Sequence, residues 1–296
     1  MSLVATLICN PADPALDTTV VDSARAILPS PGPAQWLFDE VAVDIPFSGS
    51  EDIRGIENRL RQARGDLPID IVVQPQSIRR KRLLLADMDS TMIGQECIDE
   101  MADFVGKKAE VSAVTERAMR GEIAFEPALR ARVALLKGLP ENIAEEVIAN
   151  RITLTPGGRT AIATMRKHGA YTALVSGGFT IFTQRIAAMI GFDESRGNIL
   201  NTANGLLTGE VADPIFGRDA KRAALIELRT QLKLQNTDTM ATGDGANDLD
   251  MISEAGLGVA YHAKPAVAAA AGARIDNSNL TALLYMQGYR RTEFAP

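Results

Sequence analysis

The chain has 296 residues, 46% of them hydrophobic, which suits a globular protein with a sizeable core and room for two domains. Its 31 Lys and Arg residues against 37 Asp and Glu residues give a net charge of −6, which disfavours nucleic acid as a partner. We find no apolar run near the ~20 residues of a membrane span and no signal-peptide pattern at the start, so we expect no membrane partner and a cytoplasmic location.

The two cysteines and two histidines indicate neither a disulfide framework nor a zinc site. Cys9 and Cys97 are far apart in the sequence and have no metal-like spacing. His168 and His262 stand alone, and a lone histidine is more often a surface or packing residue than a catalytic one. Any catalytic chemistry is therefore expected from other side chains.

Residues 1–78 are predicted to form a small α+β domain. Strand-like and helix-like patterns alternate over residues 4–9, 15–27, 36–47, 51–63 and 69–73. This order resembles that of ACT-type regulatory domains, which bind amino acids. The first strand-to-helix loop, residues 10–14, lacks the glycine that lets a backbone approach a ligand closely. A regulatory role and a packing or dimerisation role, with a homodimer as its product, both remain open.

A composition change marks the start of the second predicted domain, residues 79–296. Residues 74–77, Gln-Pro-Gln-Ser, are the best linker candidate, and four basic residues follow at 79–82. We interpret the basic run as a solvated approach to the next strand rather than as a nucleic-acid site.

An apolar run at residues 83–86 ends abruptly in two carboxylates, Asp87 and Asp89. Open α/β sheets place their chemistry just beyond the carboxyl ends of such buried strands. Two like charges at this spacing need compensation, which a hard cation such as Mg²⁺ supplies. The pair offers a nucleophile for phosphorus and a proton donor. Taken alone, the stretch is equally consistent with an Asx-rich turn.

Four helical patterns without an intervening strand follow the carboxylates. Apolar residues recur at three- and four-residue spacing over residues 96–105, 108–120, 125–137 and 141–151. We interpret them as a helical cap inserted at about residues 95–153.

Strand–helix alternation resumes after residue 155 and brings three more polar motifs. The strand at residues 171–175 is followed by Ser176, Gly177 and Gly178, whose hydroxyl and N–H groups can hold a phosphate oxygen. Asn204-Gly205 predicts a hairpin within residues 198–211, and Lys221 lies at the start of a helix.

The most specific later motif is the stretch at residues 240–251. It places Asp244 on a tight glycine turn beyond a strand, with Asn247 and Asp248 on the first turn of the next helix. Three oxygen-bearing side chains beside a strand end form a cation site. The last alternation, to residue 276, completes an α/β fold with a doubly wound, mainly parallel sheet of Rossmann type.

Taken together, these motifs resemble those of the haloacid dehalogenase-like phosphohydrolases over about residues 83–276. The matching motifs are residues 87–91 (Asp-Met-Asp-Ser-Thr), 176–178 (Ser-Gly-Gly), Lys221 and 243–248 (Gly-Asp-Gly-Ala-Asn-Asp), in the family's order. Glu96 and the stretch from Met119 to Arg132 further resemble the substrate-binding residues of phosphoserine phosphatases.

The resemblance implies a role for each matching residue. Asp87 is the nucleophile, Asp89 the general acid/base and Lys221 the cation between nucleophile and phosphoryl group. The expected Mg²⁺ ligands are Asp87, the Asp89 backbone carbonyl and Asp244, supported by Asp248. The expected substrate-binding residues are Glu96, Met119, Phe125, Arg132, Ser176, Gly177, Lys221 and Asn247. Without the resemblance, Met119 and Phe125 are more simply interpreted as core residues.

The resemblance therefore implies Mg²⁺-dependent hydrolysis of O-phospho-L-serine to L-serine through an aspartyl-phosphate, the last step of serine biosynthesis. Two alternatives remain at this stage. One is a related phosphatase or phosphotransferase acting on another small phosphomonoester. The other is a non-catalytic amino-acid sensor whose working part is the N-terminal domain.

Overall fold

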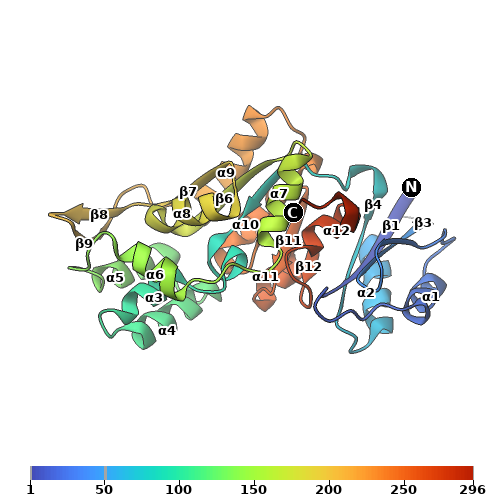
Figure 1. Cartoon of the computed structure of the whole chain (residues 1–296), viewed down its shortest axis with the longest axis horizontal. Helices are drawn as coiled ribbons and strands as arrows, with labels where there is room; N and C mark the ends of the chain where they lie inside the picture. The colour runs from blue at the N-terminus through green and yellow to red at the C-terminus, as the bar shows by residue number, and fades with distance from the viewer. Residues whose placement is uncertain (1, 50–51, 296) are drawn as a thin grey trace. The chain divides into compact units, whose positions relative to one another are not determined.

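The computed structural model describes residues 2–49 and 52–295, except for the side chain of Met119. The chain forms two compact units, and Figure 1 labels most of their helices and strands. The first comprises Met1–Arg82, Pro156–Ala170 and Ala273–Pro296, and the second Leu83–Thr155 and Tyr171–Gly272. The domain boundary at residue 78 stays a prediction.

The first unit is built on a four-stranded antiparallel sheet in the order β2–β3–β1–β4. Its strands are β1 (Ser2–Cys9), β2 (Gln35–Phe38), β3 (Ala42–Ser48) and β4 (Ile69–Pro75), with the short β12 (Ala273–Ile275) in the same unit. Its helices are α1 (Thr18–Ile27), α2 (Ile53–Arg64), α7 (Gly158–Lys167) and α12 (Ala282–Met286), with the short turns η1 (Gln76–Ile78) and η5 (Arg291–Glu293).

The central strand of this sheet, β1, is buried on both faces. Seven of its eight residues are buried, which explains why its sequence is an almost continuous apolar run. Two aspartates, Asp17 and Asp52, cap α1 and α2 by accepting hydrogen bonds from backbone N–H groups of the first helical turns. The strand and helix segments predicted for this region are observed, except that one predicted stretch divides.

One predicted stretch of this unit, residues 36–47, divides into two strands. The chain turns at residues 39–41, where Glu40 adopts a positive φ of 59°, and β3 returns antiparallel to β2. Alternating apolar residues continue on both sides of the turn, so the periodicity alone did not show where the chain reverses.

The second unit contains five of the six strands of a sheet, in the order β11–β10–β5–β6–β7, and neighbouring strands run parallel. The strands are β5 (Leu83–Ala86), β6 (Tyr171–Phe179), β7 (Glu194–Asn198), β10 (Thr239–Gly243) and β11 (Leu257–Tyr261). The helices and turns beside them are α8 (Thr180–Ile190), α9 (Arg218–Gln231), α10 (Leu249–Glu254), α11 (Pro265–Ala270), η3 (Asn236–Asp238) and η4 (Ala246–Asp248). This confirms the predicted α/β fold class with a parallel sheet.

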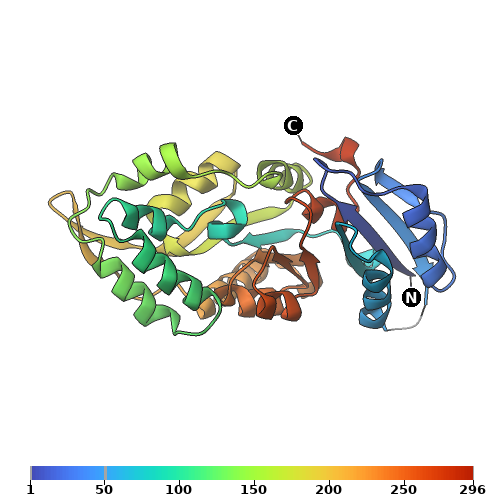
Figure 2. The same cartoon turned by 90° about the horizontal axis from the view of Figure 1, so that it is seen from below.

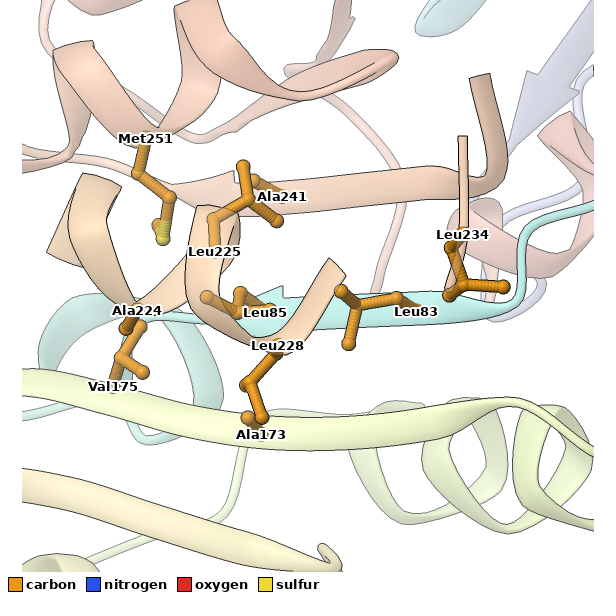
Figure 3. Close-up of a cluster of buried hydrophobic side chains, with 10 residues drawn as sticks. All are labelled: Leu83, Leu85, Ala173, Val175, Ala224, Leu225, Leu228, Leu234, Ala241 and Met251. Carbon is orange, nitrogen blue, oxygen red and sulfur yellow. The ribbon is translucent and has the colours of Figure 1, made fainter. Parts of the chain in front are cut away.

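A core of aliphatic side chains fixes α9 and α10 against the centre of this sheet (Figure 3). The strands contribute side chains from β5, β6 and β10, and the helices cover them from one face. The buried members are Leu83, Leu85, Ala173, Val175, Ala224, Leu225, Leu228, Leu234, Ala241 and Met251. This packing fixes the carboxyl ends of three neighbouring strands, where the polar motifs begin.

Four consecutive helices form the predicted cap and lie together, coloured green, in Figure 2. They are α3 (Cys97–Asp103), α4 (Lys108–Met119), α5 (Phe125–Ala134) and α6 (Ile143–Arg151). The predicted hairpin also forms from β8 (Leu200–Ala203) and β9 (Leu206–Val211), which lies beside α5. Asn204 and Gly205 both have positive φ, as their turn requires.

Over residues 2–49 and 52–295, we find no helix that is both long and apolar enough to cross a membrane.

Candidate active site

The first two carboxylates, Asp87 and Asp89, lie where β5 ends. The Asp87 N–H donates to the carbonyl oxygen of Thr242 on β10 at 2.9 Å, which fixes the backbone between two strands. A short turn follows (η2, Met88–Met92), in which Ser90 has a φ of 53°. Both carboxylates line one cavity of about 250 Å³ in the second unit. The turn thus directs two acidic groups into the same space.

Lys221 on α9 is fully buried, and its ammonium lies between two carboxylates. Its Nζ is 2.5 Å from Asp87 Oδ1 and 2.7 Å from Asp248 Oδ1. Burial acts to lower the pKa of Lys221, but the two carboxylates outweigh it and raise that pKa above the usual lysine range. The lysine is therefore a permanent positive charge beside the expected nucleophile.

Three buried aspartates, Asp87, Asp244 and Asp248, bring carboxylate oxygens within 4.8 Å of one another. Thr91 donates to Asp244 Oδ1 at 3.1 Å, and the Gly245 N–H donates to Asp248 Oδ2. Burial, together with the Asp248 charge, raises the pKa of Asp244 to about 8. Because one lysine cannot neutralise three carboxylates, this oxygen-only set fits a hard divalent cation.

The Asp89 carboxylate is held in a defined orientation by groups on both sides. Its Oδ1 accepts the Cys97 N–H at 2.9 Å, and its Oδ2 accepts the Ser176 hydroxyl at 3.1 Å. Burial raises the pKa of Asp89, although these hydrogen bonds act in the opposite direction. The raised pKa favours a protonated form that can donate to a leaving group.

The Ser-Gly-Gly motif lies within β6 rather than beyond it, because the strand continues to Phe179. Its pairing with β7 shifts register between Val175 and Phe179, so the backbone departs from a regular ladder at the motif. Ser176 Oγ accepts the Gly178 N–H at 2.8 Å, and Gly177 lines the cavity. The motif therefore lies beside Asp89, to which Ser176 donates.

Asn198 was not singled out from the sequence, although it fixes this motif. Its side-chain amide donates to the Gly177 carbonyl at 2.8 Å and exchanges hydrogen bonds with the Phe216 backbone. A buried amide satisfying three backbone groups rigidifies the strand end. Nothing in its local sequence context distinguishes Asn198 from an ordinary turn residue.

Asn247 contributes a polar atom that the rest of the protein leaves unsatisfied. The residue lines the cavity, and its Oδ1 is buried without a hydrogen-bond partner among the described residues. Such atoms are rare in folded proteins, and one that faces a pocket is available to a ligand.

The cap contributes one acidic and one basic side chain to the same cavity. Glu96 accepts the Ser90 hydroxyl at 2.6 Å, and burial together with the Asp89 charge raises its pKa well above the usual value. Arg132 on α5 is only 5% exposed, and burial lowers the pKa of its guanidinium. The cavity thus presents one acidic and one basic cap side chain besides Asp87 and Asp89.

Phe125 covers one side of the cavity and packs close to two glycines. A Cβ at Gly177 would lie 2.7 Å from the ring, and one at Gly217 would lie 3.2 Å from it. Met119 ends α4, but its side chain is outside the described residues. The cavity is also lined by residues that the sequence did not single out: Ile98, Thr115, Ile123, Leu129 and Arg218.

Comparison with known proteins adds independent information. The phosphoserine phosphatase of Polaromonas sp. is 45% identical over 223 residues, which cover 74% of this chain and 94% of that protein. A crystal structure of a haloacid dehalogenase family hydrolase from Salmonella enterica serovar Typhi matches 96% of this chain and 98% of its own, with a TM-score of 0.84 and 28% identity. A substrate-bound phosphoserine phosphatase structure matches 69% of this chain and 97% of its own, with a TM-score of 0.66 and 38% identity.

The sequence profile of the haloacid dehalogenase-like hydrolases matches residues 84–253, which include most of β5, the cap and the motif after β10. This range contains the carboxylates, the lysine and the cap residues that line the cavity. The chain belongs to the haloacid dehalogenase-like hydrolases.

Proposed function

We propose that this chain is a Mg²⁺-dependent phosphoserine phosphatase, which hydrolyses O-phospho-L-serine to L-serine and phosphate. The observation that carries the proposal is a single cavity lined by Asp87, Asp89, Glu96 and Arg132, with Lys221 held against Asp87. Asp87 with Lys221 suits reaction at the phosphate, and Glu96 and Arg132 have the charges opposite to the ammonium and the carboxylate of that substrate. The phosphoserine phosphatases among the relatives support the same conclusion.

In this proposal Asp87 attacks phosphorus and forms an aspartyl-phosphate. Lys221, 2.5 Å away, offsets the repulsion between the attacking carboxylate and the phosphoryl oxygens. Asp87, Asp244 and the Asp89 backbone carbonyl would hold Mg²⁺, with Asp248 in support. When bound, the cation supplies further charge neutralisation at the phosphoryl oxygens.

Asp89 handles the protons of both steps. It donates a proton to the serine oxygen as the ester bond breaks, since an alkoxide is a poor leaving group. The resulting carboxylate then accepts a proton from the water that hydrolyses the aspartyl-phosphate. Its hydrogen bonds from Cys97 and Ser176 keep the carboxylate facing the reacting atoms.

The remaining cavity residues bind the substrate. Ser176, Gly177 and Asn247 line the cavity, and we assign them to the phosphate, whose oxygens would accept hydrogen bonds from their O–H and N–H donors. Glu96 attracts the substrate ammonium, and Arg132 binds the substrate carboxylate through two N–H donors. Phe125 and Met119 are proposed to close the cavity against water.

Steady-state kinetics on a panel of phosphomonoesters tests the proposal. The protein should turn over phosphoserine in preference to phosphoethanolamine, which lacks the carboxylate, and should lose activity when Mg²⁺ is chelated. Arg132→Ala should weaken phosphoserine turnover far more than that of an aryl phosphate. Arg130→Ala is the matched control, because Arg130 lies on the same helix, has a side chain that is 40% exposed, and pairs with Glu126.

A preference for another phosphomonoester, or equal losses of Arg132→Ala on both substrates, would reject the assignment. Product analysis with competing alcohols separates hydrolysis from phosphoryl transfer.

We further propose a cytoplasmic enzyme without a nucleic-acid or membrane partner. The first unit is proposed to act as an ACT-like regulatory or dimerisation module. Light scattering on the full chain tests the homodimer.

A further inference from the structure

Three buried polar side chains of the cap, Arg132, Thr115 and Asp99, are joined by hydrogen bonds. Arg132 Nη1 on α5 donates to Thr115 Oγ1 on α4 at 2.7 Å, and Thr115 Oγ1 donates to Asp99 Oδ1 on α3 at 2.7 Å. Arg132, Thr115 and Asp99 are 5%, 3% and 9% exposed, respectively. Three cap helices are therefore joined by a polar network at a depth where each group needs a partner.

The chemistry of the three groups fixes the direction of both hydrogen bonds. A guanidinium only donates, so the threonine oxygen must accept from Arg132. The single hydroxyl proton is then directed to the Asp99 carboxylate, which is closer than the other acceptor, the Val111 carbonyl at 3.1 Å. Thr115 thus links the guanidinium of Arg132 to the buried carboxylate of Asp99 through two hydrogen bonds.

The same geometry determines which side of the guanidinium faces the substrate. Arg132 Nε donates to the Ala128 carbonyl at 3.1 Å on its own helix, and Nη1 is held by Thr115. A guanidinium has more N–H donors than these two bonds use, and the remaining ones are free to bind a carboxylate. Thr115 and Arg132 line the cavity, whereas Asp99 lies behind them.

We propose that Thr115 and Asp99 are positioning residues that orient Arg132 and thereby set the selectivity for phosphomonoesters that carry a carboxylate. This inference rests on the proposed role of Arg132. A long side chain that is free to sample several rotamers loses binding free energy when it is fixed by a ligand, and a guanidinium already held on one side avoids much of that loss.

Two acidic residues of α3 and its N-terminus, Asp99 and Glu96, interact with different partners. Burial lowers the pKa of the Arg132 guanidinium, and among the nearby carboxylates Asp99 opposes that shift most strongly. Glu96, the acidic cap residue that lines the cavity, accepts a hydrogen bond from Ser90 instead. Asp99 can therefore support Arg132 while Glu96 remains available for the substrate ammonium.

Thr115→Val tests the inference, because valine keeps the side-chain shape and removes the hydroxyl. We expect the KM for phosphoserine to rise on the order of tenfold or more with only a small change in kcat, as expected for a lost charge-linked hydrogen bond. Phosphoethanolamine, which has no carboxylate, should lose much less. Thr115→Ser should restore most of the selectivity, and Asp99→Asn should weaken it as Thr115→Val does.

Ser112→Ala is the control on the same helix, since Ser112 lies outside the residues that line the cavity. Equal losses of Thr115→Val on both substrates, or an unchanged KM for phosphoserine, would overturn the inference. If Arg132→Ala discriminates between the two substrates and Thr115→Val does not, the inference fails while the proposed function stands. If Arg132→Ala does not discriminate, both fail. Should Thr115→Val not fold, Asp99→Asn decides by the same criteria, and Thr115→Ser is the variant that should keep the selectivity.

Discussion

Removing the charge of Lys221 should destabilise the protein more than any ordinary surface substitution. Lys221→Met keeps the length and apolar volume of the side chain, so it leaves little cavity and mainly removes the ammonium. Lys221 and Asp248 are 0% exposed in their side chains and Asp87 is 4% exposed, so water cannot take over the lost interaction. Breaking a buried ion pair on one side costs roughly 3–5 kcal/mol, and two carboxylates lose their partner here. We therefore expect the free energy of unfolding to fall by about 4 kcal/mol at neutral pH.

Urea denaturation without added cation measures this loss, and pH provides an internal check. Burial and the Asp248 charge already raise the pKa of Asp87 above its unfolded value, and losing Lys221 raises it further. A carboxyl group with a raised folded pKa destabilises the protein when ionised, so the deficit of the variant should shrink as the pH falls.

Arg222→Met is the matched control for this experiment. Arg222 is the next residue on α9, and its ion pair with Glu254 is half exposed, so its loss should change the stability by less than about 1 kcal/mol. Equal losses in the two variants, or a deficit that does not depend on pH, would refute the view that Lys221 neutralises a buried acidic cluster.

Three further predictions follow from the site and the first unit. Gly177→Ala places a Cβ 2.7 Å from the Phe125 ring, so the KM for phosphoserine should rise on the order of tenfold, and an unchanged KM would mean that the ring shifts freely. The pKa of Asp244, about 8, means that Mg²⁺ binding at neutral pH should release protons and weaken as the pH falls, which calorimetry in buffers of different ionisation enthalpy detects. Asp70→Ala leaves backbone donors such as the Asn277 N–H without their acceptor. The free energy of unfolding should therefore fall by about 3 kcal/mol or more, while kcat per folded molecule stays the same. A urea midpoint equal to that of the unchanged protein would contradict this last expectation.

The sequence predicted those parts of the fold in which local patterns and long-range packing agree. The apolar run at residues 83–86 is buried on both faces of a parallel sheet, and such strands appear in sequence as continuous hydrophobic segments. The Asn204-Gly205 turn was predictable because its positive φ angles favour those residue types. The four cap helices were recognised by their spacing, within a few residues of their observed ends.

The parts that were not predicted depend on contacts between distant segments. Asn198 and Thr115 are ordinary polar residues in the sequence, and only the folded chain shows that one holds Gly177 and the other Arg132. The extension of β6 through Ser176 was also missed, since glycines usually indicate the end of a strand. Turn residues at 39–41 interrupt an apolar pattern that continues on both sides, so the reversal between β2 and β3 left no periodic signal.

The most direct test of the proposed mechanism is to trap the phosphorylated protein. Acid quenching during turnover of phosphoserine with Mg²⁺, followed by mass spectrometry of peptides, should find one phosphoryl group on the peptide containing Asp87, and Asp87→Asn should show neither the adduct nor turnover. An adduct on another residue, or substantial turnover by Asp87→Asn, would contradict the account.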